Sequence, residues 1–192
     1  MESGSEITTN AFWKKEGLRH IKPNTGKEFP EGFNVLGYLE KWANGRRVVE
    51  IGCGYGRLCG AFPVDEYIGY DINPQAVEKA KRMFPDYPFF PLEDSVLFPS
   101  DLVMFYTVLL HIPDESIIDF IKSVTGFAPN VLVAEVMGRK WRRQGNPPVF
   151  NREPAEYDEI FKEAGFLPIK RQALPYKRYK NTDITFIEYE RY

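Results

Sequence analysis

The sequence is poor in the residues that build disulfides and metal sites, with two cysteines and two histidines among 192 residues. Cys53 and Cys59 lie too close together to staple a fold, so we expect reduced, buried thiols. His20 and His111 are far apart, and neither has cysteines or acids nearby at metal-ligand spacing. The sequence therefore predicts no metal site.

Long apolar runs and an excess of one charge are also missing. No run approaches the roughly 20 apolar residues of a membrane span. The first ten residues, MESGSEITTN, lack the apolar core of a signal peptide. The 25 Lys and Arg residues nearly balance the 27 Asp and Glu residues, which gives no global case for nucleic-acid binding. We expect a cytoplasmic protein without membrane contact, either a monomer or a homodimer.

The length and composition are those of one globular domain. The chain is 43% hydrophobic and 27% charged, both ordinary for a soluble protein. Residues 1–9 are polar and predict a loose arm, and residues 11–20 predict a short helix. Apolar runs then alternate with helical patterns, which is typical of an α/β fold.

The most informative stretch is Val48–Arg57, VVEIGCGYGR. Its apolar start predicts a buried parallel strand. The glycines that follow allow a sharp turn and the close approach of a ligand. We expect a short helix over 57–62 whose free N–H groups face that ligand. A dinucleotide site needs G-x-G-x-x-G, whereas this spacing is G-x-G-x-G. A glycine-rich turn without a ligand is the alternative.

The stretch closely resembles the first motif of class I S-adenosylmethionine (SAM)-dependent methyltransferases, an acid followed by G-x-G-x-G. The resemblance implies that the turn holds the methionine part of SAM and that the acid organises the site near the cofactor's amino group. The residues concerned are Glu50, Gly52, Cys53, Gly54, Tyr55 and Gly56. A nicotinamide enzyme ranks last because of the glycine spacing.

Two further acidic positions match the same family. Asp71, followed by Ile72, ends the predicted strand 67–71, where an acid accepts from both ribose hydroxyls. Capping of the next helix is the other reading, but Asn73 and Pro74 already supply a cap. By resemblance, Glu93 holds the adenine amino group through its side chain and Asp94 meets the ring through its backbone N–H. For both, a solvated loop acid is the alternative.

The segment Asp101–Pro113 is similar to the corresponding segment of those family members that methylate small molecules. By this resemblance Tyr106 and Thr107 lie over the transferable methyl group, and Tyr106 contributes to both cofactor binding and catalysis. His111 has two interpretations. It is either the general base that takes a proton from the acceptor, which its pKa near 6.5 would suit, or a structural residue that ties the loop down.

The resemblance covers about residues 46–192 and implies a Rossmann-like seven-stranded sheet of order 3-2-1-4-5-7-6 with the last strand antiparallel. Helices are expected on both faces. Residues 1–45 would form an arm and helices that cover the active site. Trp13 would then line the acceptor pocket. The alternative is that Trp13 only pins the arm to the core.

Two basic, aromatic stretches are predicted at the ligand side of the sheet, in the loops 138–151 and 175–181. Arginine forks bind carboxylates and phosphates, so Arg142 and Arg143 predict an anionic acceptor. The alternative is that these residues form a solvated loop that binds no ligand and only keeps the protein soluble. A nucleic-acid strand is a third, lower-ranked one, since such loops also bind single strands.

These observations favour a SAM-dependent methyltransferase that acts on the oxygen or nitrogen of a small, anionic molecule of sugar or natural-product type and releases S-adenosylhomocysteine (SAH). The competing enzyme hypothesis is an RNA or protein methyltransferase. The competing class is a SAM-binding protein without transferase activity. A cavity that Trp13 or Trp141 fills would favour the last.

Overall fold

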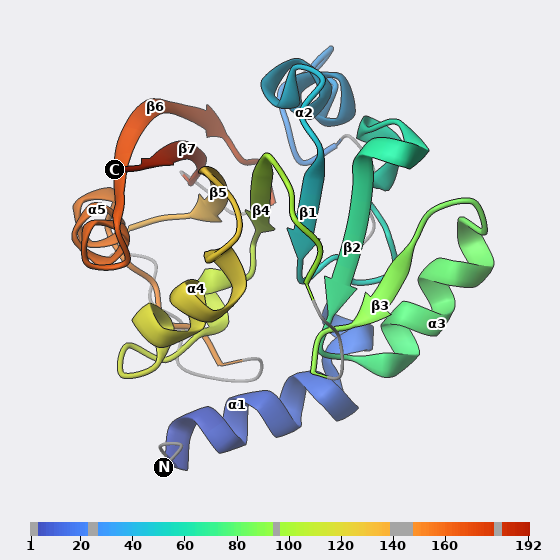
Figure 1. The fold of residues 1–192 in the computed structure, drawn as a ribbon, viewed down its shortest axis with the longest axis horizontal. Helices are drawn as coiled ribbons and strands as arrows, with labels where there is room; N and C mark the ends of the chain where they lie inside the picture. Colours follow the sequence, from blue (N-terminus) through green and yellow to red (C-terminus); the bar gives the residue numbers. More distant parts are fainter. Residues whose placement is uncertain (1–3, 23–26, 94–96, 139–147, 179–181) are drawn as a thin grey trace.

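A computed structural model of the protein describes residues 4–22, 27–93, 97–138, 148–178 and 182–192. Its strands form one sheet in the order β3-β2-β1-β4-β5-β7-β6 (Figure 1). The predicted order is confirmed, and β7 is antiparallel to both β5 and β6, while the other strands pair in parallel. The strands are β1 (Val48–Ile51), β2 (Tyr67–Asp71), β3 (Phe89–Pro91), β4 (Leu102–Tyr106), β5 (Asn130–Val136), β6 (Phe166–Pro175) and β7 (Asp183–Arg191).

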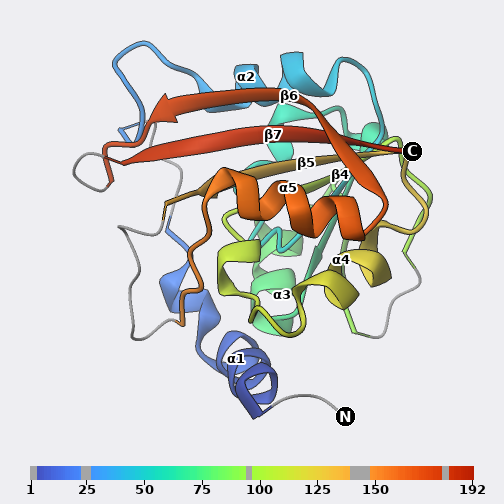
Figure 2. The same ribbon diagram turned by 90° about the vertical axis from the view of Figure 1, so that its left-hand side faces the viewer.

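Helices cover both faces of the sheet. Residues of α2 and α3 share one buried cluster with one face, and residues of α4 and α5 share a second cluster with the other. Figure 2 shows α2 and α5 on opposite sides of β6 and β7. The helices are α1 (Gly4–Lys15), α2 (Val35–Ala43), α3 (Pro74–Met83), α4 (Ile117–Thr125) and α5 (Pro154–Glu163). Within the described residues, none of these helices has the length and apolarity to cross a membrane.

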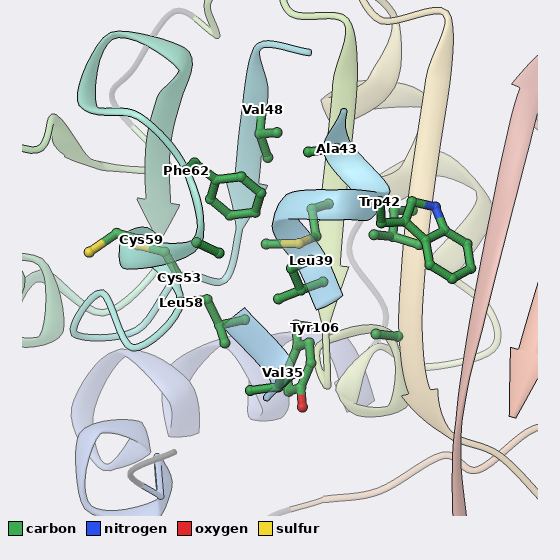
Figure 3. Close-up of a cluster of buried hydrophobic side chains, with 14 of the residues drawn as sticks. Val35, Leu39, Trp42, Ala43, Val48, Cys53, Leu58, Cys59, Phe62 and Tyr106 are labelled. Carbon is green, nitrogen blue, oxygen red and sulfur yellow. The ribbon is translucent and has the colours of Figure 1, made fainter. Parts of the chain in front are cut away.

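The central strands are buried on both sides, as their sequences predict. All four residues of β1 and all five of β4 are buried. Such strands read as near-continuous apolar runs because helices pack on each face. The cluster that α2 forms against one face includes Leu39 and Tyr106 (Figure 3). Tyr106 is therefore anchored in the core although it ends β4.

The amino-terminal segment lies at the carboxyl edge of the sheet. α1 crosses beyond the arrowheads of β1 and β2, and a 3₁₀ turn over Gly17–His20 follows it (Figure 1). The expectation of a loose arm over residues 1–9 is wrong for residues 4–9, because α1 begins at Gly4. That the amino-terminal region covers the active site stays a prediction.

The short helix predicted over 57–62 is also wrong. The chain forms only a 3₁₀ turn at Cys59–Ala61. Gly60 weakens a helix there, and Pro63 prevents its continuation. The glycine turn is therefore not followed by an α-helix whose amino terminus could bind a ligand.

Candidate active site

A cavity of about 400 Å³ opens at the carboxyl ends of β1, β2 and β4. Open α/β sheets bind their ligands at this edge, and the volume is within the range of sites for small ligands. The ends of these strands form one side of the cavity. The amino-terminal segment from Asn10 to Lys22 forms another, and Val149, Tyr176 and Arg178 complete it.

The glycine turn has the backbone that its sequence predicts. Gly52, Gly54 and Gly56 have φ values of +80°, +58° and +81°, a region that L side chains rarely adopt. Added Cβ atoms would overlap Val108 at Gly52, Ile21 at Gly54 and Phe89 at Gly56. The turn is thus packed between the loop after β4, the amino-terminal segment and β3, and among the three glycines only Gly52 lines the cavity.

Asp71 lies in the cavity wall with its carboxylate largely buried. One oxygen accepts from the Gly54 N–H at 2.7 Å, and the other accepts from the Asn73 N–H at 2.8 Å. Burial raises its pKa, while these two hydrogen bonds oppose the rise. Asn73 caps α3 through Ala76 N, as predicted. Asp71 therefore ties the glycine turn to the end of β2 and still has lone pairs for a ligand.

Glu50 points into the core rather than into the cavity. It is 1% exposed and accepts a hydrogen bond from the Tyr67 hydroxyl at 2.5 Å. Burial raises its pKa to about 7, although the Tyr67 hydrogen bond and the positive charge of Arg57 lower it. Glu50 therefore does not line the cavity, and its role near the cofactor's amino group stays a prediction.

Tyr106 and Thr107 turn the chain at the end of β4. Thr107 has φ of +56°, unusual for a β-branched residue and a sign of local strain. Arg57 donates to Thr107 Oγ1 at 2.8 Å and to the Tyr106 carbonyl at 3.2 Å. Its guanidinium lies 5.0 Å from the centroid of the Tyr106 ring. All three residues line the cavity.

His111 also lines the cavity, on the same loop. Its Nδ1 lies 2.7 Å from the Pro148 carbonyl oxygen. A carbonyl only accepts, so Nδ1 carries the proton and Nε2 of the neutral ring has a lone pair. Burial lowers the pKa of His111 to about 4. The imidazole is therefore uncharged at neutral pH.

The predicted acceptor residue Trp13 lies against His111. Their ring centroids are 4.4 Å apart, and Trp13 lines the cavity. The Trp13 carbonyl accepts from Asn73 Nδ2 at 2.7 Å, which ties α1 to the end of β2. A Cβ at Gly17 would lie 2.6 Å from the Trp13 ring, so the glycine makes room for the indole.

Positive side chains gather at the cavity. Lys22, Arg57 and Arg178 line it, and Arg178 forms an ion pair of 2.6 Å with the buried Glu28. The sequence interpretation included Arg178 in a basic loop but gave Arg57 and Lys22 no role. The position of Arg57 directly after the last glycine was the available signal. Lys22 had none, since it comes from a loop of irregular sequence.

The cavity brings together part of the predicted site. Gly52, Asp71, Ile72, Tyr106, His111 and Trp13 lie in its wall. Several predicted cofactor residues do not line the cavity, namely Glu50, Cys53, Gly54, Tyr55, Gly56 and Glu93. Asp94, Arg142 and Arg143 lie outside the described residues. The described residues hold no cluster of His, Cys, Asp and Glu suited to a metal ion.

Glu93 has a partner other than a ligand. Its carboxylate lies 2.5 Å from Lys14 Nζ in an exposed ion pair. Leu92 and Ile72 are the neighbouring residues that do line the cavity. The predicted contact of Glu93 with adenine would require the Lys14 pair to rearrange.

Comparisons with known proteins support the fold. No family model matches the sequence, and no curated protein matches it. Magnesium protoporphyrin IX methyltransferase from Synechocystis PCC 6803, solved with SAH, is 15% identical with a TM-score of 0.71 over 97% of this chain and 99% of that chain. The 1,6-didemethyltoxoflavin-N1-methyltransferase of Burkholderia thailandensis is 14% identical, with a TM-score of 0.71 over 100% of this chain and 91% of that chain.

A putative RNA methyltransferase from Pyrococcus horikoshii is also similar, at 14% identity and a TM-score of 0.59 over 91% of this chain and 95% of that chain. Structures this distant in sequence share the fold, and a fold does not by itself define an activity. The chain therefore has the Rossmann-like fold of SAM-dependent methyltransferases, as predicted. Its chemistry must be argued from its own cavity.

Proposed function

We propose that this protein is a SAM-dependent methyltransferase that acts on a small molecule. The observation that carries the proposal is the buried carboxylate of Asp71, placed in a cavity wall beside the glycine turn of β1. In this fold, that pair of features sits at the edge of the sheet where ligands bind. The similar methyltransferases solved with SAM or SAH support the choice of cofactor.

Each part of SAM has a matching part of the cavity. The second lone pairs of the Asp71 oxygens accept from the two ribose hydroxyls. Ile72 and Leu92 supply apolar surface for the adenine ring. Gly52 leaves space for the methionine part. Tyr106 and Thr107, at the end of β4, then lie near the transferable methyl group.

Methyl transfer from a sulfonium mainly requires the acceptor to be placed in line with the methyl group, with water excluded. Trp13 and the rest of the amino-terminal segment cover the cavity and serve both needs. His111 accepts the proton that the acceptor oxygen or nitrogen loses, at Nε2, while its Nδ1–H stays on Pro148. The structural and catalytic interpretations of His111 use different nitrogens, so one ring can serve both, although a pKa of about 4 makes Nε2 a weaker base than the value of 6.5 on which the catalytic interpretation rests.

An anionic acceptor fits the cations at the cavity. Lys22, Arg57 and Arg178 supply this charge within the described residues, and Arg142 and Arg143 stay part of the proposal from the sequence. Two carboxylate sources share this chemistry, namely the methionine carboxylate of SAM and an acidic group of the acceptor. A guanidinium binds either in a bidentate manner.

Calorimetric titration with SAM, SAH and NAD tests the cofactor. We expect SAM and SAH to bind and NAD to fail. Asp71→Ala should weaken SAM binding about 10- to 100-fold, since a hydrogen bond to a charged group contributes about 1.5–3 kcal/mol. Asp86→Ala, which removes an exposed acid away from the cavity, is the matched control. Binding of NAD instead of SAM would contradict the proposal.

Arg57→Gln and Arg178→Gln separate the two anion sources. A weaker SAM affinity assigns the cation to the cofactor, whereas an increased KM for an acidic acceptor at unchanged SAM affinity assigns it to the acceptor. SAM affinity and the KM for the acidic acceptor are also measured for Arg142→Ala and Arg143→Ala. If neither quantity changes in any variant, the anionic acceptor is wrong.

The contact between Trp13 and His111 also suits a second candidate, a SAM-binding protein without transferase activity. In that case Trp13 fills the acceptor position permanently. Transfer of the labelled methyl group of SAM to members of a panel of acidic small molecules favours the enzyme. SAM binding without turnover, in both the wild type and Trp13→Ala, favours the binding protein.

A further inference from the structure

The loop after β4, residues 107–112, forms one side of the cavity, yet side chains from much later in the sequence hold it in place. Glu135, on β5, accepts from the N–H groups of both Val108 and Leu109 at 2.7 Å. A buried N–H without a partner would cost about 1–3 kcal/mol. Glu135 thus fixes the start of the loop.

Arg152 binds the same loop as a hydrogen-bond donor, whereas Glu135 is an acceptor. It donates to the carbonyls of Leu109, at 3.0 Å, and Ile112, at 2.7 Å. It is 2% exposed and also pairs with Asp114 at 2.6 Å. Two backbone N–H groups of the loop are therefore satisfied by a buried acid on β5, and two of its carbonyls by a buried base in the segment before α5.

Stability alone does not explain these two residues. Glu135 is fully buried, which raises its pKa to about 8. Among the described residues, its second oxygen, Arg152 Nε and the Tyr157 hydroxyl are buried without a hydrogen-bond partner. Unpaired buried polar groups are costly, and those on Glu135 and Arg152 offset part of what their hydrogen bonds to the loop backbone contribute to stability. What Glu135 and Arg152 provide is a defined loop conformation.

That conformation determines where His111 lies. A further hydrogen bond joins the loop to a later segment, since the N–H of Phe150 donates to the Leu110 carbonyl at 2.7 Å. Among the described residues, the Trp13 ring and the Pro148 carbonyl contact the imidazole, and His20 is the ionisable group whose charge also lowers its pKa. Displacement of the loop would take His111 out of these surroundings and expose it to water.

We propose that Glu135 and Arg152 are positioning residues that fix the loop 107–112 and, through it, the imidazole of His111 in the cavity wall. A role in catalysis rests on the proposed methyl transfer. The positioning itself does not, because it can be measured in the protein alone.

NMR titration of the two histidine rings tests the proposal. The signals of the two rings are told apart with His20→Asn, in which only the His111 signals remain. In the wild type, His111 should stay neutral over about pH 5.5–8, where an unperturbed histidine titrates. In Glu135→Leu and in Arg152→Met, we expect its pKa to rise by one unit or more toward about 6.5, with His20 unchanged. Glu135→Gln retains the accepting oxygen and should preserve the wild-type behaviour.

Asp114→Asn is the matched control, because it removes the charge of the exposed partner of Arg152 and leaves both loop contacts. A merely structural role would lower the unfolding temperature of Glu135→Leu but leave the pKa of His111 low in the folded protein, and this result would overturn the proposal. Should Glu135→Leu fail to fold, the pKa of His111 in Arg152→Met decides the question in the same way. Failure of SAM to bind would refute the proposed function and leave this measurement valid.

Discussion

Two neighbouring strands, β1 and β4, end side by side at the cavity, and their loops are held in different ways. The turn after β1 is fixed by its glycine backbone and by the adjacent end of β2, where Asp71 accepts from the Gly54 N–H. Its glycines adopt positive φ, and the N–H groups of Gly52 and Cys53 both donate to the Tyr70 carbonyl of β2. The loop after β4 depends on Glu135 and Arg152, side chains from later in the chain.

The difference explains what each loop can tolerate. A turn that depends on glycine conformation fails when a glycine is replaced. A loop that depends on distant side chains can have a varied sequence of its own, as long as its partners stay. The two are also in contact, because a Cβ at Gly52 would overlap the side chain of Val108. The first loop thus forms a surface on which the second packs.

Gly52→Ala should have the largest effect. The residue has φ of +80°, and the added methyl group would overlap Val108. Backbone strain and overpacking each cost about 1–3 kcal/mol, so we expect a loss of about 4 kcal/mol in the free energy of unfolding. Urea denaturation measures it. Gly60→Ala is the control, since a methyl group added there would meet no atom within 4 Å and the φ of Gly60 is ordinary. Equal losses in both variants would contradict the comparison.

A pH-dependent test comes from the buried acids Glu50, on β1, and Glu135, on β5. Glu50 binds only the Tyr67 side chain among its described partners, whereas Glu135 binds loop backbone. Burial raises the pKa of Glu50 from 4.5 to about 7. An acid whose pKa is raised on folding favours the folded state most below its unfolded pKa, and this stability is lost as the pH rises through about 7.

Glu50→Gln removes this pH dependence and retains an oxygen for Tyr67. We expect the variant to gain about 2–3 kcal/mol on the wild type between pH 5 and pH 8, at 1.36 kcal/mol per pKa unit. Urea titrations at both pH values measure the gain. The pKa of His111 should stay unchanged in this variant, unlike in Glu135→Leu. A difference between the two proteins that is constant with pH would show that Glu50 does not titrate as stated.

The same contrast explains how much the sequence could predict. The strand order was predicted correctly from the resemblance to the methyltransferase family. The glycine turn was predicted correctly because its requirements are local, namely an apolar strand followed by residues that tolerate positive φ. The positions of Asp71 and Asn73 followed from the end of a strand and the start of a helix. Each of these local signals lies within a few residues of the feature that it marks.

The rest of the candidate site depends on packing between distant segments. Nothing near Glu135 or Arg152 in the sequence indicates that they bind the loop after β4, since their partners lie 26 to 43 positions away. Glu50 fits the methyltransferase motif, yet its side chain turns into the core to reach Tyr67. Whether a strand residue faces a cavity or the core is decided by the tertiary structure.

The smallest expected effect concerns the segment that covers both loops. Within the described residues, α1 is tied to the sheet edge by the hydrogen bond from Asn73 to the Trp13 carbonyl and by the exposed Lys14–Glu93 pair. An exposed ion pair contributes at most about 1 kcal/mol. Serine caps a helix about as well as asparagine but is too short to reach Trp13. Asn73→Ser should therefore release α1 and leave α3 capped.

We expect Asn73→Ser to lower the free energy of unfolding by no more than about 1 kcal/mol, the net value of one hydrogen bond. Hydrogen exchange of peptides from residues 10–22 should become about fivefold faster, because local opening reports the lost contact while the global core is unchanged. Asn34→Ser, which alters the cap of α2 in the same way, is the matched control. Unchanged exchange over 10–22 would mean that packing of Trp13 on His111 holds the segment without the Asn73 contact. The cover of the cavity would then be as firmly fixed as the two loops beneath it.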